Sequence, residues 1–423
     1  MTGLCRFGKK IEEISNLDLQ STRQIQFPFL QRGMYFFRSI LFSVILLISF
    51  FVSCRTSIPP EIQIAEIRKD FNVDNLPVVL VPGIKGSILK DNKGDIRWLT
   101  GFQSLNFSTP ELRLYGESYD LIPSGAIPRV TAIPYILDVA IYSPFLESMS
   151  QEKDIDFYVF SYDWRKDNLI NRDRLISFLE SLNQKYKKKP ILVGHSMGGM
   201  ISLSIENSKP NLVDKVIYVG TPFRGGIGFM DDLMLGVDTG LNSEIVSPCV
   251  LAKFRSVYGF FPRLNTADSK NTILDEQGKS LSVDFFSAKD WHDHSLGHYS
   301  INCKPDDLPN PIAFQDILNR AKLFRKSLDP SKPINSTNRR LVISAKNRST
   351  MRSMVRLSKA EMGKGSEWKF DSSPKVPGDG SVCYEDSLPP DGIKYDSLET
   401  EYEHSALLND PKVISGILEF IRK

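Results

Sequence analysis

Residues 192–200 read LVGHSMGGM, which contains the pattern G-x-S-x-G at Gly194–Gly198. An apolar stretch precedes this pattern, and a stretch with helical spacing, 197–208, follows it directly. A strand that turns straight into a helix strains its central residue and leaves room only for glycine at the flanking positions. Such a turn exposes the central hydroxyl above the positive end of the helix. We therefore predict that Ser196 is a nucleophile rather than a small residue in a turn.

Apolar and helical stretches alternate along much of the chain. Short β-branched stretches occur at 77–83, 155–164, 189–196, 214–222 and 339–345, and helical patterns occur at 172–186, 197–208 and 410–423. Strands that alternate with helices predict a mainly parallel sheet with helices on both faces. We place this α/β domain at 77–423.

Two stretches interrupt the alternation. Residues 85–150 and 223–335 are rich in proline, glycine and aromatic residues and lack the pattern of strands and helices. Insertions of this kind cap the sheet and shape the substrate site. The sequence therefore predicts two caps over the domain.

A serine hydroxyl is a weak nucleophile until a base removes its proton, and after this type of junction the acid and then the histidine follow in the chain. Of the five histidines, His195 lies inside the junction, while His292, His294 and His298 precede the last predicted strand. His404 follows that strand and lies on a predicted loop before the terminal helix. We therefore predict that His404 is the base.

The acid should lie between the last predicted strand and His404. Asp379 is flanked by two glycines, which let the backbone turn its carboxylate toward the imidazole. Asp371, Asp386 and Asp391 occur in the same interval and are alternatives. Asp379 is the preferred candidate.

The oxyanion that forms on the attacked carbonyl needs two backbone N–H donors. The residue after the nucleophile, Met197, supplies one in this type of junction, and a loop after an earlier strand supplies the other. In the stretch VLVPGIKGS we predict Ile84 as the second donor, because Gly83 lets the backbone approach closely. The alternative for this stretch is an ordinary turn that ends a strand.

Six motifs, in order, carry a family resemblance. PVVLVPGIKGS, FSYDWR, LVGHSMGG, YVGTPFRGG, GDGSV and the late EH resemble the ordered motifs of the lecithin:cholesterol acyltransferase family over residues 77–405. The resemblance implies an α/β-hydrolase fold and an enzyme that removes an acyl chain from a lipid ester through an acyl-enzyme. It implies a triad of Ser196, Asp379 and His404 with Ile84 and Met197 as oxyanion donors. Water or an alcohol would accept the acyl chain.

One departure from that family concerns the lid. Animal members have a cysteine-bridged lid soon after the oxyanion strand, whereas residues 85–150 contain no cysteine. We therefore expect a different lid.

Two alternatives for the function stay open, namely a carboxylesterase for soluble short-chain esters and a non-catalytic surface lipoprotein. The aromatic stretch 256–264 and a predicted membrane tether favour a lipid substrate.

Charge and composition exclude several kinds of partner. The 53 lysines and arginines nearly balance the 50 aspartates and glutamates, and no basic cluster is interleaved with aromatic residues, so nucleic acid is not an expected ligand. No protein partner is indicated, and serine acyl transfer requires no cofactor.

The stretch WHDHSLGH at 291–298 could suggest zinc, but its histidine spacing favours a polar loop. The five cysteines lack C-x-x-C spacing and predict neither a zinc knuckle nor a disulfide scaffold.

The N-terminal region predicts export. Arg38 precedes an uncharged, mostly apolar run at 39–53, which is shorter than the ~20 residues of a spanning helix and ends at Cys54. Residues 34–54 resemble a bacterial lipoprotein signal with lipidation at Cys54, or else an uncleaved signal anchor. Residues 1–33 are a polar extension or precede a true start at Met34, and 55–76 form a tether. The domain is thus expected at a membrane surface outside the cytoplasm.

Overall fold

The structure is a computed structural model that describes residues 72–114, 120–133, 137–263, 272–300, 302–303, 308–329, 338–357, 368–370 and 373–423. All of them belong to the second of two compact units, Ile58–Lys423. The predicted extension 1–33, the signal segment 34–54 with Cys54, and most of the tether 55–76 lie outside the described residues.

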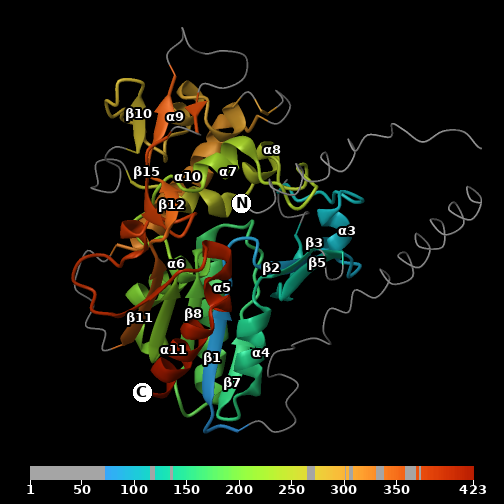
Figure 1. The fold of residues 1–423 in the computed structure, drawn as a ribbon, viewed down its shortest axis with the longest axis vertical. Helices are drawn as coiled ribbons and strands as arrows, with labels where there is room; N and C mark the ends of the chain where they lie inside the picture. Colours follow the sequence, from blue (N-terminus) through green and yellow to red (C-terminus); the bar gives the residue numbers. More distant parts are fainter. Residues whose placement is uncertain are drawn as a thin grey trace, which may run out of the picture. The chain divides into compact units, whose positions relative to one another are not determined.

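A parallel six-stranded sheet forms the centre of the domain, in the order β16-β11-β9-β8-β1-β7 (Figure 1). Its strands are β1 (Leu76–Val81), β7 (Ile155–Val159), β8 (Ile191–His195), β9 (Lys215–Val219), β11 (Arg339–Ala345) and β16 (Asp396–Thr400). The sequence predicted all of these strands except β16. That edge strand reads DSLET and is mostly exposed or half-buried, so it lacks the apolar signal of the other five.

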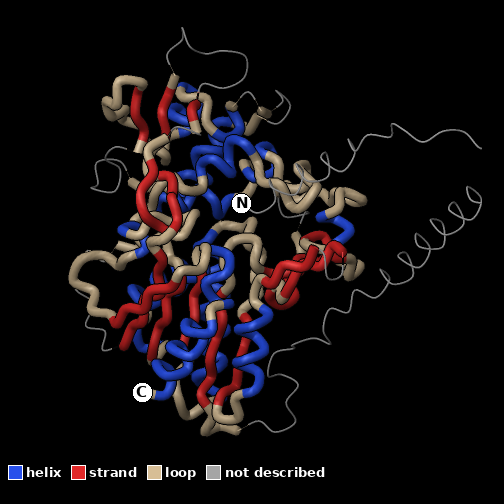
Figure 2. The backbone as a smooth tube through the Cα atoms, in the orientation of Figure 1, coloured by secondary structure: helices blue, strands red, loops and turns tan. Residues whose placement is uncertain are grey.

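Helices cover both faces of the sheet, as the sequence predicted (Figures 1 and 2). Alternate residues of each strand point to opposite faces, so Val79 and Val78 of β1 belong to two different apolar cores. The core that contains Val79 includes α5 (Asn168–Lys185), α6 (Met197–Ser208) and α10 (Pro311–Ser327). The core that contains Val78 includes α4 (Ser143–Gln151) and α11 (Pro411–Arg422). Because both faces of the sheet are buried, its central strands read as continuous apolar runs in the sequence.

Short side chains at the helix starts set several boundaries. Asp167 accepts a hydrogen bond from the Leu169 N–H, so α5 begins four residues earlier than its apolar pattern at 172–186 indicated. Asp410 caps α11 through the Lys412 N–H in the same way.

The first insertion contains small antiparallel sheets. Its elements are β2 (Ser87–Lys90), β3 (Ile96–Trp98), α3 (Gly101–Ser104), β4 (Ile122–Ala126), β5 (Arg129–Ile133) and β6 (Leu137–Ala140). The predicted boundary at 150 falls inside α4, which packs on the central sheet.

The second insertion is mostly helical. It contains α7 (Met230–Leu235), α8 (Pro248–Leu251), a 3₁₀ helix at Arg255–Phe260, β10 (Ile273–Asp275), α9 (Ala288–Asp293), a 3₁₀ helix at Gly297–Tyr299 and α10. Strands β13 (Met354–Arg356) and β14 (Trp368–Lys369) join β10 in a sheet, and β12 (Arg348–Met351) pairs with β15 (Lys375–Gly378). Further 3₁₀ helices lie at Pro210–Leu212, Glu385–Ser387 and His404–Asn409.

The described residues 256–263 of the aromatic stretch lie inside this second insertion. Tyr258 and Phe261 are buried, and their rings lie 5.1 Å and 5.5 Å from the ring of Trp291 in edge-on contacts. Aromatic edge-to-face packing of this kind stabilises a core. These side chains therefore belong to the core of the cap, and the lipid substrate that the sequence analysis inferred from this aromatic stretch stays a prediction.

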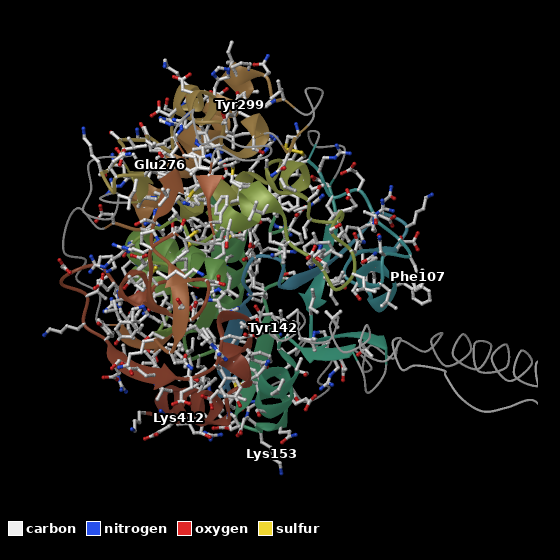
Figure 3. The ribbon with its side chains drawn as sticks, turned by 45° about the horizontal axis from the view of Figure 1, so that its top comes forward. Phe107, Tyr142, Lys153, Glu276, Tyr299 and Lys412 are labelled. Atoms are coloured by element: carbon white, nitrogen blue, oxygen red, sulfur yellow. A yellow bond between two sulfur atoms is a disulfide. The ribbon has the colours of Figure 1, made fainter. Side chains whose placement is uncertain are left out.

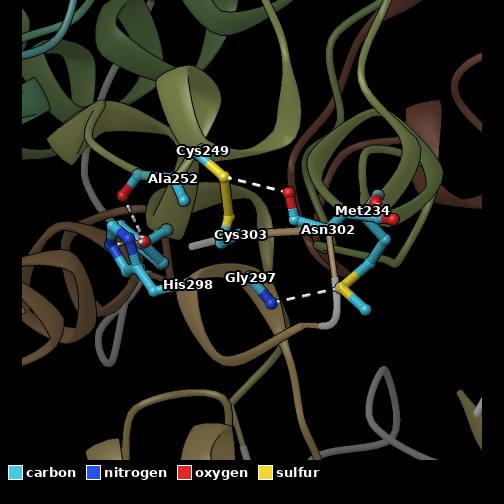
Figure 4. Close-up of a disulfide and its surroundings, with 8 residues drawn as sticks. Met234, Cys249, Ala252, Gly297, His298, Asn302 and Cys303 are labelled. Carbon is cyan, nitrogen blue, oxygen red and sulfur yellow. Dashed lines mark hydrogen bonds between the residues drawn. A yellow bond between two sulfur atoms is a disulfide. The ribbon is translucent and has the colours of Figure 1, made fainter. Parts of the chain in front are cut away.

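One disulfide corrects the expectation from cysteine spacing. Cys249 and Cys303 are bonded, with Cα atoms 5.4 Å apart, and they lie 54 positions apart in the chain (Figure 4). The bond joins α8 to the segment after the Gly297–Tyr299 helix, and only the folded cap brings these positions together. Cys383 is buried with a free thiol. Within the described ranges, none of the helices has the length and apolarity needed to cross a bilayer.

A buried ion pair ties the FSYDWR motif to the first insertion. Asp163 and Arg165 are 0% and 1% exposed, and the Arg165 Nε and Nη2 atoms lie 2.8 Å and 2.7 Å from the two carboxylate oxygens of Asp163. The Arg165 Nη1 donates to the Leu112 carbonyl at 2.9 Å. Removing one partner of such a pair leaves an uncompensated buried charge.

We expect Arg165→Met to lower the free energy of unfolding by about 3–5 kcal/mol, measured by urea denaturation. Arg172→Met removes the exposed pair with Asp173 and should change that free energy by less than about 1 kcal/mol. The double variant Asp163→Asn/Arg165→Met should recover part of the loss. A loss for Arg165→Met as small as that for Arg172→Met would contradict this account.

Candidate active site

Ser196 lies in the tight turn between β8 and α6. Its backbone has φ 53° and ψ −120°, a region that non-glycine residues rarely adopt, and its N–H donates to the Val219 carbonyl at 2.8 Å. A Cβ on Gly198 would lie 2.0 Å from the Val81 oxygen, and one on Gly199 would lie 1.8 Å from the Thr221 Oγ1. Any side chain at these glycines would therefore move α6 and its first residue away from the sheet.

Three side chains from distant parts of the chain meet at this turn. The His404 Nε2 lies 2.9 Å from the Ser196 Oγ, and the His404 Nδ1 lies 2.7 Å from the Asp379 Oδ2. Asp379 follows β15, and His404 begins the 3₁₀ helix before α11. The imidazole can thus donate from Nδ1 to the carboxylate and accept the serine proton at Nε2.

Backbone groups fix the carboxylate of Asp379. Its Oδ1 accepts hydrogen bonds from the N–H groups of Ser381 and Val382, and its own carbonyl accepts the N–H of His404 at 3.0 Å. Burial alone would raise the pKa of Asp379, but the charge and hydrogen bond of His404 and the two N–H groups hold that pKa below its usual value. Burial would lower the pKa of His404, but Asp379 outweighs burial and raises it. The site therefore stabilises a carboxylate beside an imidazolium.

The other candidate acids lie elsewhere. Asp386 is buried and pairs with Arg352, whose Nη1 lies 2.9 Å and 3.0 Å from its two oxygens. Asp391 is 98% exposed and contacts Arg224. Asp371 lies outside the described residues. Among the described carboxylates the structure thus brings Asp379 to His404, and the catalytic role of the three residues stays a prediction.

The predicted oxyanion donors flank Ser196. A Cβ on Gly83 would lie 3.0 Å from the Ser196 Cβ, so the loop after β1 passes very close to the serine. In the described part of the chain, the N–H groups of Ile84 and Met197 have no hydrogen-bond partner. Met197 is the first residue of α6, where backbone N–H groups are free to bind an anion. Both donors are available, and their role in binding an oxyanion stays a prediction.

Two charged residues near His404 were missed by the sequence analysis. The Lys85 Nζ lies 3.6 Å from the Asp232 Oδ2 in α7, and the Trp98 Nε1 donates to the Lys85 carbonyl at 2.9 Å. Lys85 lowers the pKa of His404 and Asp232 raises it. Burial and the adjacent Asp232 raise the pKa of Asp231 to about 6. The only signal in the sequence is a pair of acids within an apolar helix, FMDDLML.

The three histidines of 291–298 do not converge. His292 is exposed, His294 contacts the Arg356 guanidinium, and His298 is buried with its Nε2 3.2 Å from the Tyr258 hydroxyl (Figure 4 shows His298 near the disulfide). The described residues contain no group of three or more side chains placed to hold a metal ion.

Opposite charge changes beside His404 should move its pKa in opposite directions. We expect Asp232→Asn to lower the pKa of His404, because Lys85 then acts without its partner, and Lys85→Met to raise it, because Asp232 is left alone. Titration of the His404 Cε1 proton by NMR measures both shifts. Asp173→Asn, on the exposed face of α5, is the control and should leave this pKa unchanged. Shifts of the same sign in both variants would refute this assignment.

Comparison with known families gives one match over much of the domain. The sequence profile described as "Lecithin:cholesterol acyltransferase" matches residues 138–363, just over half of the chain. The matched range includes Ser196 and ends before Asp379 and His404.

Individual relatives match over shorter segments. The protein described as uncharacterized protein YJR098C of Saccharomyces cerevisiae is 28% identical over 172 residues, 37% of this chain and 25% of that protein. Lecithin-cholesterol acyltransferase-like 4 of Arabidopsis thaliana is 27% identical over 195 residues, 38% of this chain and 36% of that protein. The matches thus cover about a quarter to a third of these relatives' own lengths.

A solved structure shows the same fold. The chain from "The crystal structure of Tle4-Tli4 complex" superimposes with a TM-score of 0.53 at 13% identity, over 82% of this chain and 99% of that chain. The parallel sheet, the helices on both faces and the strand–serine–helix turn are those of an α/β-hydrolase, which confirms the predicted fold class. The profile match and the fold together show that this chain belongs to the lecithin:cholesterol acyltransferase family.

Proposed function

We propose that this chain, a member of a family of hydrolases and acyltransferases, is a serine-dependent lipid acyl hydrolase and O-acyltransferase. One observation carries the proposal, namely the continuous line of hydrogen bonds from Ser196 through His404 to Asp379. Nucleophile, base and orienting acid stand in the order that serine acyl transfer requires. Two unpaired N–H groups beside the serine support it further.

The first half of the reaction forms an acyl-enzyme. The Ser196 oxygen attacks the ester carbonyl while the His404 Nε2 takes the serine proton, and the new oxyanion lies at the Ile84 and Met197 N–H groups. The carboxylate of Asp379 stabilises the imidazolium. The tetrahedral intermediate then collapses, the bond to the leaving alcohol breaks, and His404 gives its proton to that alcohol's oxygen.

The second half transfers the acyl group. His404 removes a proton from water or from an acceptor alcohol, whose oxygen attacks the acyl-enzyme carbonyl. Collapse of the second tetrahedral intermediate returns the proton to Ser196 and releases a fatty acid or a new ester. Water is the default acceptor, and an alcohol competes only where it is held in line with the carbonyl.

The substrate class we propose is a phospholipid or neutral lipid ester. Family membership supports a lipid donor, and the two insertions support an enclosed site, since Lys85 of the first insertion and Asp232 of the second meet beside His404. A carboxylesterase for soluble short-chain esters is the second candidate, because the same three residues would serve it equally.

Replacement of the proposed triad tests the chemistry. On phospholipid vesicles with and without a long-chain alcohol, free fatty acid reports hydrolysis and new ester reports transfer. Ser196→Ala should lose both products by roughly 10⁴-fold or more, and Asp379→Asn by roughly 10³–10⁴-fold. Asp386→Asn changes a buried acid of the same loop region and serves as the matched control.

Three results would contradict the proposal. Turnover that survives Ser196→Ala would show that Ser196 is not the nucleophile. A larger loss of turnover in Asp386→Asn than in Asp379→Asn, in variants that fold equally well, would assign the role of the orienting acid to Asp386. Failure of a fluorophosphonate probe to label folded wild type would favour a binding protein without catalysis.

We further propose that the chain is exported and anchored at a membrane surface through Cys54. The apolar run at 39–53 and the cysteine after it support export, and the Cys249–Cys303 bond is typical of an oxidising compartment. A palmitate analogue should label the wild type and not Cys54→Ala. Equal labelling of both would exclude lipidation at this residue.

A further inference from the structure

The hydroxyl group of Tyr142 lies between the oxyanion loop and the nucleophile turn. Tyr142 is the last residue before α4 and is labelled in Figure 3. Its Oη lies 3.1 Å from the Gly83 nitrogen and 2.7 Å from the His195 Nδ1. The His195 Nε2 lies 3.0 Å from the His404 carbonyl oxygen. Three loops of the site are thus joined through two side chains that are 2% and 6% exposed.

The chemistry of the end groups sets the direction of each hydrogen bond. The His404 carbonyl only accepts, so the His195 Nε2 carries the proton, and the Nδ1 of a neutral ring is then an acceptor. The Tyr142 O–H therefore donates to that Nδ1, and the Tyr142 oxygen accepts the Gly83 N–H. The hydrogen bonds run from Gly83 through Tyr142 and His195 to the backbone of His404. Each donor in this series has one acceptor, and each acceptor has one donor.

Both side chains stay neutral in this environment. Burial, and then the nearby charge of His404, lower the pKa of His195 to about 3. Burial raises the pKa of Tyr142 well above its usual value. The rings of His195 and His404 lie 5.2 Å apart, so a charged His195 would repel the imidazolium that forms on His404 during acyl transfer. A neutral His195 connects the loops without that repulsion.

We propose that Tyr142 and His195 are positioning residues that hold the Gly83–Ile84 backbone in register with His404. The proposal rests on the proposed function, because it concerns the placement of the oxyanion donor for that reaction. Neither residue touches the reacting atoms. Each acts through the backbone of a neighbour, Tyr142 through Gly83 and His195 through His404.

Close packing makes this placement sensitive to small shifts. Gly83 passes so close to Ser196 that even a methyl group would make contact at 3.0 Å, and a Cβ on Gly86 would lie 2.9 Å from the Tyr142 hydroxyl. The Gly86 N–H donates to the Gly83 carbonyl at 3.1 Å, so the hydroxyl lies against a tight turn. Oxyanion donors act only within a few tenths of an ångström of their position, and a 1 Å error can cost ~10²-fold in rate.

A purely structural role would have a different signature. Tyr142 and His195 also pack edge to face, with ring centroids 5.6 Å apart, so their loss could reduce stability without changing the chemistry of the folded enzyme. Tyr142→Phe keeps the ring and removes only the hydroxyl. Turnover per active site, determined by fluorophosphonate titration, then separates positioning from folding.

We expect Tyr142→Phe to reduce kcat by roughly 10–100-fold while KM changes by less than about 2-fold, because the oxyanion contact is made in the transition states. The inhibition constant of an alkyl boronic acid should rise by the same factor as kcat/KM falls. Its tetrahedral adduct on Ser196 places an oxygen at the oxyanion donors. Tyr158→Phe is the control, since it removes from β7 a buried hydroxyl that bonds the Tyr186 hydroxyl at the end of α5, and it should leave both quantities unchanged.

A second experiment, by NMR, tests the hydrogen bonds of Tyr142 without measuring turnover. In the wild type, ¹⁵N NMR should show His195 as the neutral Nε2–H tautomer between pH 5 and 8. In Tyr142→Phe, the His195 Nδ1 and Gly83 amide signals should both shift, because the same Tyr142 hydroxyl bonds both groups. Tyr158→Phe should leave these signals in place.

The outcomes separate the two proposals. Unchanged kcat and boronate affinity in Tyr142→Phe, with an active wild type, would overturn the positioning role and leave the proposed function intact. A wild type without Ser196-dependent turnover would defeat the proposed function, and with it the kinetic role of Tyr142. Unshifted His195 and Gly83 signals in Tyr142→Phe would refute the link between the loops in either case.

Discussion

The contact between helix α6 and the end of strand β1 is the constraint on which the site depends. Gly198 lies so close to the Val81 carbonyl that a Cβ would come within 2.0 Å of it. This approach places the first turn of α6 directly above the sheet and holds Ser196 at a positive φ. The strain of about 1–3 kcal/mol at such a residue is sustained by the surrounding packing. Relaxing the contact would move the serine away from both His404 and the oxyanion loop.

The other parts of the site are arranged around that fixed turn. Asp379 accepts the backbone N–H of His404 as well as its ring proton, so acid and base are held as one unit. The first insertion reaches this unit through Tyr142 and His195, and the two insertions meet where Lys85 contacts Asp232. Each connection is a hydrogen bond or ion pair across elements far apart in the chain. The geometry of the serine thus depends on both caps as well as on the sheet.

Some structural features could be predicted because their causes are local. The strands β1, β8 and β9 are buried on both faces and therefore read as continuous apolar runs. Strand β16 lies at the polar edge of the sheet and has no such run. The Cys249–Cys303 bond joins positions 54 residues apart and obeys no local spacing, so the cysteine pattern did not reveal it. Similarly, the aromatic composition of the cap did not reveal that Tyr258 and Phe261 pack against Trp291.

By itself, the sequence determined the fold class and the position of the strained serine turn, and it pointed to His404 and to a short set of candidate acids that follow the serine in chain order. Periodicity, glycine sterics and chain order are properties of short segments, and they need no knowledge of distant contacts. Only the tertiary structure decided which carboxylate meets His404, which charges surround it, and how Tyr142 and His195 join the oxyanion loop to the histidine loop. These depend on hydrogen bonds and an ion pair between residues 25 to 209 positions apart, and only a specific packing of sheet and caps brings such residues into contact.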